Sequence, residues 1–328
     1  MKRFIFVIFV ILVFSMLINL SGLATENKWK ETWPKEVRIA AGSVGGGSYM
    51  QVSALVNAVK KEFPDASLRI ESAKGSVHNI QLIDAKQVEF GTASADTIWE
   101  AWNGKGVFKD KEIKSFRLLM PTMPSPYIFV TLKKNNINSL TDLNNKRYGA
   151  GVKGGSVAIF LEKVFETFKV NVDYVYLEAT DTVLALKNGV IQGFTLGHPA
   201  PAIQDLSWTI DTNIFGVTEK EGEKILNSHP ELIYPLTIPA GYYKGQDKDV
   251  ICVGTYQTVI VRDDLPEDFV YSIVKAAYEN IDIIKNTWPL MAEGMSLESL
   301  KFLSVPLHPG AVKYYKEIGI EIPENLVF

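Results

Sequence analysis

Short apolar runs alternate along the chain with glycine-rich loops and with stretches in which apolar residues recur at helical spacing. In the first third, this pattern predicts strands and helices in the order β-α-β-α-β. The predicted segments are a strand at 37–40, a helix at 52–59, a strand at 68–70, a helix opening at 75–80 and a strand at 88–92. This order is typical of a mostly parallel sheet with helices packed on it, so we expect an α/β fold.

The same order of elements returns in the middle of the chain. A strand ends at Tyr148, a glycine loop runs to Ser156, and a helical apolar stripe, a strand, a second helix and a closing strand follow. Aligning 46–48 with 154–156 brings the two units close to register, which predicts an internal pseudo-repeat of two similar lobes. The alternative is that any two α/β units look alike at this level of detail.

The C-terminal part of the chain, from residue 255 onward, indicates how the two predicted lobes are joined. The segment 255–262 reads as a strand that returns before a helical C-terminal region. A mature chain of about 300 residues also exceeds one ordinary hydrophobic core. We therefore expect a first lobe of 36–127 plus 253–328 and a second lobe of 128–252, joined by two connections that form a hinge.

The first 24 residues predict export. A basic start, Met1-Lys-Arg3, precedes an apolar core that begins at Phe4, and small residues at Gly22 and Ala24 fit a signal-peptidase site. We expect residues 1–24 to be a signal peptide that is removed, which gives a periplasmic (extracytoplasmic) protein. The alternative is an uncleaved membrane anchor, because the run is close to the length that spans a bilayer.

Composition narrows the function classes. The chain is 47% hydrophobic and 22% charged with a net charge of −3, and it has no long basic stretch after the leader, so we expect no nucleic-acid partner. Cys252 is the single cysteine, which excludes an internal disulfide. The four histidines are scattered without metal spacing, and no nucleophile lies beside a base. We expect no enzyme activity, no metal and no cofactor.

One motif favours a different function. Gly149-x-Gly151-x-x-Gly154 has the spacing of a dinucleotide-binding loop, with Asp173 or Glu178 at the distance of the ribose-binding acid. An NAD-dependent oxidoreductase is therefore an alternative. It is the less favoured one, because nicotinamide cofactors are scarce outside the cytoplasm.

The two glycine loops have a simpler common use. Each leaves a strand and enters a helix N-terminus, where unpaired N–H groups and the helix dipole favour an anion. Glycine lets the backbone approach, Ser48 and Ser156 add hydroxyl donors, and Lys153 could add a point charge. If the lobes face each other, these sites converge on one cleft that suits a small carboxylate.

Several longer runs resemble the TAXI family, the extracytoplasmic solute receptors of TRAP-type transporters. These runs are Gly45-Gly-Gly-Ser-Tyr49, Lys74-Gly-Ser-Val-His-Asn79, Ala95-Asp-Thr-Ile-Trp-Glu-Ala-Trp-Asn-Gly104, Ile238-Pro-Ala-Gly-Tyr-Tyr-Lys-Gly-Gln-Asp-Lys-Asp-Val250 and Pro306-Leu-His-Pro-Gly-Ala-Val-Lys-Tyr-Tyr315. The resemblance covers nearly the whole mature chain. It implies a type II periplasmic binding protein fold, closing by a hinge on a solute of the glutamate, 2-oxoglutarate or dicarboxylate class and delivering it to TRAP membrane permease subunits.

The chain departs from that family at several positions. Gly42, Gly45 and Ser48 stand where threonines are usual, and Ser94-Ala95-Asp96 replaces a Gln-Ser-Asp. His198 lies in a short loop after a strand end, where open α/β sheets bind ligands, and Asp96 could contact a ligand ammonium or cap the next helix. The candidate ligand-binding residues are Ser43, Gly46, Gly47, Ser48, Tyr49, Ser76, Asn79, Ser94, Asp96, Lys153, Gly154, Gly155, Ser156, His198 and Pro199. A ligand-sensing periplasmic domain of a signalling receptor would share these features and is the main alternative to transport.

Overall fold

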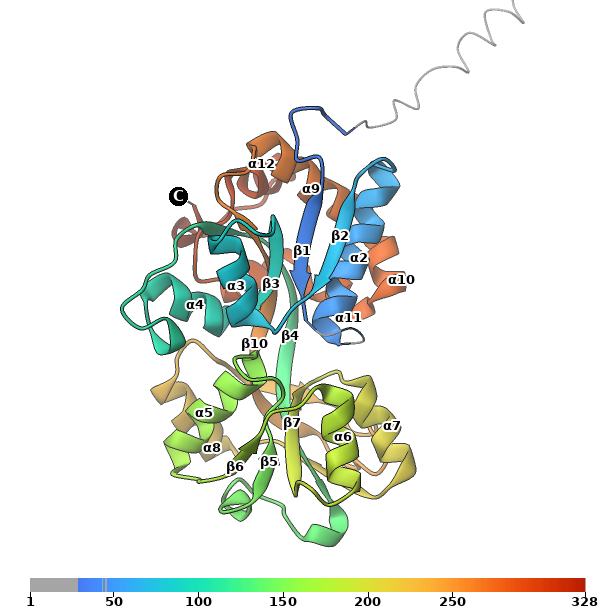
Figure 1. The fold of residues 1–328 in the computed structure, drawn as a ribbon, viewed down its shortest axis with the longest axis vertical. Coiled ribbons are helices and arrows are strands. Elements are labelled where there is room, and N and C mark those ends of the chain that lie inside the picture. The colour runs from blue at the N-terminus through green and yellow to red at the C-terminus, as the bar shows by residue number, and fades with distance from the viewer. Residues whose placement is uncertain (1–28, 43, 45, 328) are drawn as a thin grey trace, which may run out of the picture.

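The computed structural model describes residues 29–42, 44 and 46–327 (Figure 1). The predicted signal peptide at 1–24 and the candidate residue Ser43 lie outside the described residues. Within that part of the chain, every helix is too short or too polar to cross a bilayer.

The strands form one twisted sheet that runs through both halves of the molecule. Its order is β2-β1-β3-β10-β4-β7-β5-β6, with β8 paired to β4 and β9 paired to β10. The strands are β1 (Val37–Ala41), β2 (Leu68–Ser72), β3 (Phe90–Ser94), β4 (Phe116–Leu132), β5 (Arg147–Gly149), β6 (Asp173–Val175), β7 (Gly193–Gly197), β8 (Thr212–Phe215), β9 (Ile233–Ile238) and β10 (Val250–Arg262).

Helices cover the faces of this sheet (Figure 1). Their apolar faces supply much of the core, as in α5, where six of the inward residues are buried and aromatic or aliphatic. The helices are α2 (Gly47–Glu62), α3 (Ser76–Asp84), α4 (Ala95–Asn103), α5 (Ser156–Phe168), α6 (Ala179–Lys187), α7 (Pro201–Thr209), α8 (Glu219–Ser228), α9 (Glu267–Glu279), α10 (Ile281–Thr287), α11 (Pro289–Gly294) and α12 (Pro309–Glu317).

The two β-α-β-α-β units share one topology. In the first unit, β1 lies between β2 and β3 and pairs with both in parallel. In the second unit, β5 lies in the same way between β6 and β7. The units therefore agree in connectivity and strand order, as the pseudo-repeat predicts.

The core residues separate into two regions, which Figure 1 shows as an upper and a lower lobe. One buried cluster draws on 33–120 and 259–326, so the C-terminal helices pack on the first unit. The other two clusters draw on 127–253. We keep the predicted division into 36–127 plus 253–328 and 128–252, and the hinge between them, as a proposal.

Two long strands connect the lobes. Strand β10 pairs with β9 in one lobe over 250–254 and with β3 in the other over 257–261. Strand β4 runs beside it, and its pairing with β10 is irregular at Gln257. Three prolines, Pro121, Pro124 and Pro126, lie in this part of β4, and proline supplies no N–H to a sheet. The sheet is thus irregular where it crosses between the lobes.

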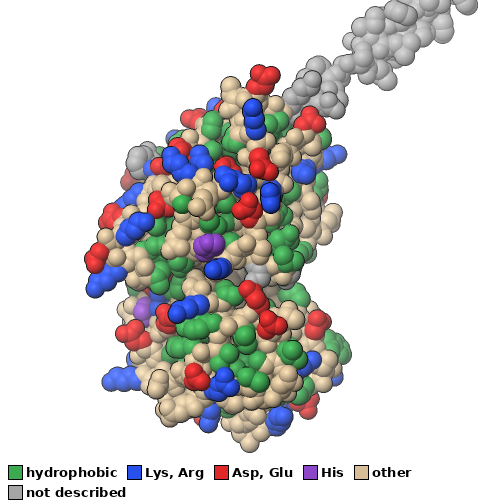
Figure 2. Space-filling model, in the orientation of Figure 1, with side chains coloured by type: hydrophobic (Ala, Val, Ile, Leu, Met, Phe, Trp, Pro, Cys, Tyr) green, Lys and Arg blue, Asp and Glu red, His purple; other side chains and the backbone are tan. Residues whose placement is uncertain are grey.

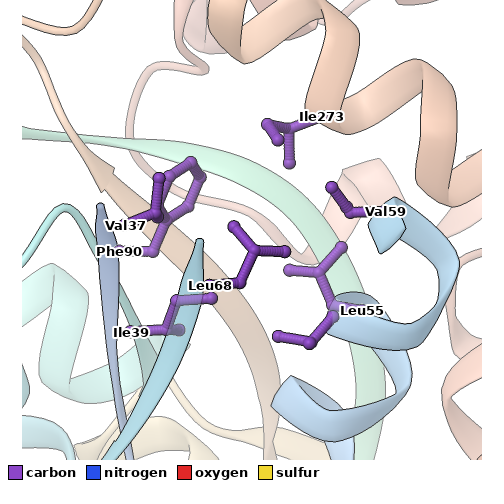
Figure 3. A pocket seen from close by; sticks show the side chains of 8 residues that line it. Val37, Ile39, Leu55, Val59, Leu68, Phe90 and Ile273 are labelled. Atoms are coloured by element: carbon purple, nitrogen blue, oxygen red, sulfur yellow. The ribbon is translucent and has the colours of Figure 1, made fainter. Parts of the chain in front are cut away.

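A small gap lies inside the first lobe, between the sheet and helices α2 and α9 (Figure 3). Its volume is about 10 Å³ and its walls are aliphatic and aromatic side chains, among them Ile39, Leu55 and Phe90. A water molecule needs polar partners as well as room. This gap is a packing defect of the core and offers nothing to a solute.

Candidate functional site

A cleft of about 600 Å³ lies between the lobes, within the range of small-molecule sites. Its walls come from the loops after β1, β5 and β7, and its floor from the crossing strands β4 and β10. The carboxyl ends of parallel strands are where open α/β sheets bind ligands. On the face shown in Figure 2, acidic and basic side chains are mixed, without a large patch of one sign.

Five of the described helices begin at this cleft. Helices α2, α3 and α5 are preceded by Gly46, Gly75 and Gly155, which line the cleft and provide no side-chain cap. The first N–H groups of a helix have no partner within it. Helices α6 and α7 also begin in the cleft wall. The site is therefore surrounded by backbone donors and the positive ends of helix dipoles.

The glycine loops of the two lobes touch. A Cβ added at Gly75 in the first lobe would lie 3.1 Å from the Cα of Gly155 in the second. Gly75 also has a φ of +100°, a backbone conformation that residues other than glycine rarely adopt. Glycine at both positions lets the lobes approach backbone to backbone at the edge of the cleft.

Hydroxyl groups from both lobes add donors near these helix ends. Ser48 is hydrogen-bonded to Thr92, and both line the cleft. Ser76 lies 3.3 Å from Ser94, oxygen to oxygen, and accepts the Ser94 N–H at 3.1 Å. Ser156 lines the opposite wall. Such groups can donate to a carboxylate without carrying charge.

Tyr127 on β4 is a buried member of the lining. Its ring stacks on Phe160 with the centroids 4.3 Å apart, and its exposed fraction is 1%. No described residue forms a well-aligned hydrogen bond with its hydroxyl oxygen. Burial raises the pKa of this hydroxyl well above its usual value, and the nearby Ser156 hydroxyl acts in the opposite direction. The group is thus a neutral donor at the floor of the cleft.

His198 follows β7 and also lines the cleft. Its Nδ1 lies 2.9 Å from the hydroxyl oxygen of Tyr243, and its exposed fraction is 9%. Burial lowers the pKa of His198 to about 4, because a charged imidazole would lose its water. At neutral pH this residue contributes hydrogen bonding and shape to the cleft without charge.

The charged members of the lining are acidic. Glu178 and Asp205 border the cleft, and the part of the lining that the structure describes has no lysine or arginine. Lys153, the predicted point charge, is exposed, and its Nζ lies 5.9 Å from the ring centroid of Tyr176. Helix ends and hydroxyl groups, not cationic side chains, are therefore the groups of the described lining that can donate to an anion.

The predicted ligand-binding residues divide into two groups. Those that line the cleft are Gly46, Gly47, Ser48, Ser76, Gly155, Ser156, His198 and Pro199. Those outside the described lining are Tyr49, Asn79, Ser94, Asp96, Lys153 and Gly154. Tyr49 packs against the core of the first lobe, and Asn79 donates to the carbonyl of Thr92 at 2.7 Å, supporting the lining from behind.

Asp96 lies outside the described lining of the cleft. It is the second residue of α4, and its side chain is fully buried and does not cap that helix. One carboxylate oxygen accepts from the Thr255 hydroxyl at 2.9 Å, and the other lies 3.6 Å from Lys163 Nζ. Lys163 belongs to the second lobe, so Asp96 takes part in a contact between lobes. The sequence could not reveal this pairing because its members are far apart along the chain.

Sequence reasoning missed lining residues on the crossing strands and on α2. Ser125 and Tyr127 come from β4, Gln257 comes from β10, and Gln51 accepts from Thr122 at 2.8 Å. The proline-rich run 121–126 was the available signal, because repeated proline marks a strand with an unusual role.

The dinucleotide alternative depends on an acid at the carboxyl end of β6. Asp173 is at the opposite end, where it begins β6 and its carboxylate accepts from Arg147 Nε at 3.3 Å. Glu178 does line the cleft, as the residue before α6. One of the two candidate acids is therefore away from the site.

A protein-family comparison matches residues 39–319 to the NMT1-like family. The chain belongs to the NMT1-like family. This NMT1-like protein is also similar to solved structures at low sequence identity. A periplasmic transporter is 13% identical with a TM-score of 0.57, covering 90% of this chain and 94% of that one. An ancestral arginine-binding protein bound to arginine is 13% identical with a TM-score of 0.51, covering 78% and 98%.

A further structure, a protein from Bordetella bronchiseptica RB50, is 15% identical with a TM-score of 0.52 and covers 88% of this NMT1-like chain and 99% of its own. At these identities the similarities show the fold alone. They confirm the predicted fold class, the α/β type II periplasmic binding protein fold with two lobes about a cleft.

Proposed function

We propose that this NMT1-like protein is an extracytoplasmic solute receptor of a TRAP-type transporter, of the TAXI kind. It binds one small carboxylate-bearing solute in the cleft and delivers it to membrane permease subunits. The observation that carries this proposal is the convergence of three glycine-capped helix N-termini on a cleft of about 600 Å³. That arrangement binds a small anion by its backbone and needs no cofactor.

The comparisons support a receptor. Two of the similar structures are described as a periplasmic transporter and as a protein bound to arginine, a small molecule that carries a carboxylate. The described residues contain no cluster of histidine, cysteine, aspartate and glutamate that could hold a metal ion. His198 has a tyrosine and no nucleophile as its hydrogen-bond partner. A binding role accounts for the cleft without a reaction.

The second candidate is a ligand-sensing periplasmic domain of a signalling receptor, which would use the same cleft. Transport and sensing differ in their membrane partner. If TRAP membrane subunits are encoded beside this chain, reconstituting them in proteoliposomes tests the proposal. We expect solute uptake only when the purified protein is added outside. Uptake at the same rate without it, or the absence of any binding to the membrane subunits, would contradict the transport role.

A further inference from the structure

The cleft has two chemically different ends. At one end, helices α2, α3 and α5 have glycine caps and no acidic residue in their first turns. At the other end, α6 is preceded by Glu178 and carries Asp181 in its first turn. Helix α7 has no acidic residue in its first turn, but it begins with Pro201, which has no N–H, and Asp205 borders the cleft one turn further on. Acidic side chains offset a helix dipole. The first end therefore attracts an anion more strongly than the second.

We propose that the cleft selects a solute with a single carboxylate and an uncharged, mainly apolar remainder, and that the Tyr127 hydroxyl is a specificity-determining contact to that carboxylate. This inference rests on the proposed function as a solute receptor and narrows its ligand class. It departs from the dicarboxylates that the family resemblance implies.

Tyr127 provides an observation independent of the helix ends. Apart from the nearby Ser156 hydroxyl, the buried Tyr127 hydroxyl has no partner among the described residues, so it retains hydrogen-bonding capacity that a ligand can use. Its hydroxyl is at the cleft floor, close enough to Ser156, the first residue of α5, for that hydroxyl to influence its pKa. A carboxylate held by the N-terminus of α5 would accept from both hydroxyls.

The remainder of the solute would meet apolar walls. Leu177, Val183 and Leu196 line the second lobe's side of the cleft, and Met123 lines the floor. A second carboxylate placed there would lose its water and face Glu178 and Asp205, with no described lysine or arginine in the lining to compensate. An aliphatic group would instead gain from burial.

Titration calorimetry with matched pairs of acids tests the selection. The pairs are 4-methyl-2-oxopentanoate against 2-oxoglutarate, and 4-methylpentanoate against glutarate, so that the members of each pair differ by one carboxylate and neither carries an ammonium group. We expect the monocarboxylate to bind at least about ten-fold more tightly in each pair, the effect of one uncompensated charge. Tighter binding of either dicarboxylate would overturn the inference and leave the receptor function standing. If no carboxylate in the panel binds, both this inference and the proposed carboxylate ligand fail.

Replacing Tyr127 tests the contact itself. Tyr127→Phe should weaken binding of the preferred monocarboxylate about ten-fold, because one hydrogen bond to a charged group is lost. Tyr148→Phe is the matched control: Tyr148 is equally buried, but its hydroxyl bonds Thr195 at 2.9 Å and lies outside the cleft lining. The control should keep its affinity. Equal affinity in Tyr127→Phe and the wild type, with both proteins folded by thermal melting, would overturn the assignment.

Discussion

At the scale of single residues, burial sets the behaviour of the ionisable groups near the cleft. His198 has its pKa lowered to about 4, whereas a histidine in an unfolded chain titrates near 6.5. Between these values the unfolded chain binds the proton and the folded chain does not. The stabilising contribution is therefore complete above pH ~6.5 and is lost as the pH falls toward 4.

This difference predicts a pH dependence of stability. Urea unfolding should show that His198 accounts for a loss of about 2–3 kcal/mol between pH 7 and pH 4.5. In His198→Gln, which cannot take up a proton, the loss over this range should be smaller by that amount. An identical loss in the variant and the wild type would show that His198 is not held neutral by burial.

Substituting Lys153 tests whether this residue adds a point charge to the ligand site, as the sequence alone suggested. The residue is in the glycine loop but points its Nζ toward Tyr176 at the surface, so Lys153→Ala should change solute affinity by less than about two-fold. Gly155→Val should abolish binding, because a Cβ there would lie 2.9 Å from Val152 Cγ2 and 3.1 Å from its carbonyl oxygen. Calorimetry on both variants checks this. A ten-fold loss in Lys153→Ala would place the lysine at the ligand.

At the scale of elements, the sequence predicted what depends on local pattern. The glycine loops and the start of α5 follow from a strand, a flexible loop and a helical stripe in sequence, and the structure has them at those positions. Helix α2 begins at Gly47, earlier than the predicted start at Val52, because the end of the glycine loop is itself helical. The crossing strands were harder to predict. Strand β4 is 17 residues long with three prolines, and its role depends on partners in both lobes.

The contact between α4 and α5 could not be predicted from the sequence pattern either, because its residues belong to different lobes. Lys163 on α5 lies 2.8 Å from Glu100 and 3.6 Å from Asp96 on α4, and 2.9 Å from Glu231. Its side chain is 11% exposed. Burial raises the pKa of Glu100, and Lys163 opposes this shift. One lysine thus compensates three carboxylates beside the crossing strands.

Lys163→Met should destabilise the protein by about 3–5 kcal/mol, because it leaves buried carboxylates without their cation. Chemical unfolding measures this. Lys275→Met is the matched control, since Lys275 makes ion pairs with Glu279 and Glu317 at 3.7 and 3.3 Å on the surface. We expect the control to cost less than about 1 kcal/mol. Similar decreases in the free energy of unfolding of both variants would show that the Lys163 cluster between the lobes stabilises the protein no more than a surface ion pair does.

At the scale of the whole molecule, the two lobes meet at Gly75 and Gly155, and β4 and β10 join them. The proposed hinge closure of the cleft requires this backbone approach. Gly75→Ala should therefore weaken solute binding at least about ten-fold by holding the lobes apart, with both lobes still folded. Gly189→Ala is the control: Gly189 also has a positive φ, +73°, but a Cβ there would meet nothing within 4 Å. Equal binding losses in the two variants would mean that backbone strain, not lobe contact, is responsible.

The central claim is that the cleft between the lobes holds a small carboxylate, and the most direct measurement is mass spectrometry of what the protein carries. Protein purified from its native host is washed, denatured, and the released molecules are identified. We expect one small carboxylic acid per chain, absent from Gly155→Val prepared in the same way. Release of NAD or another nucleotide, or the same acid in equal amount from Gly155→Val, would contradict the account.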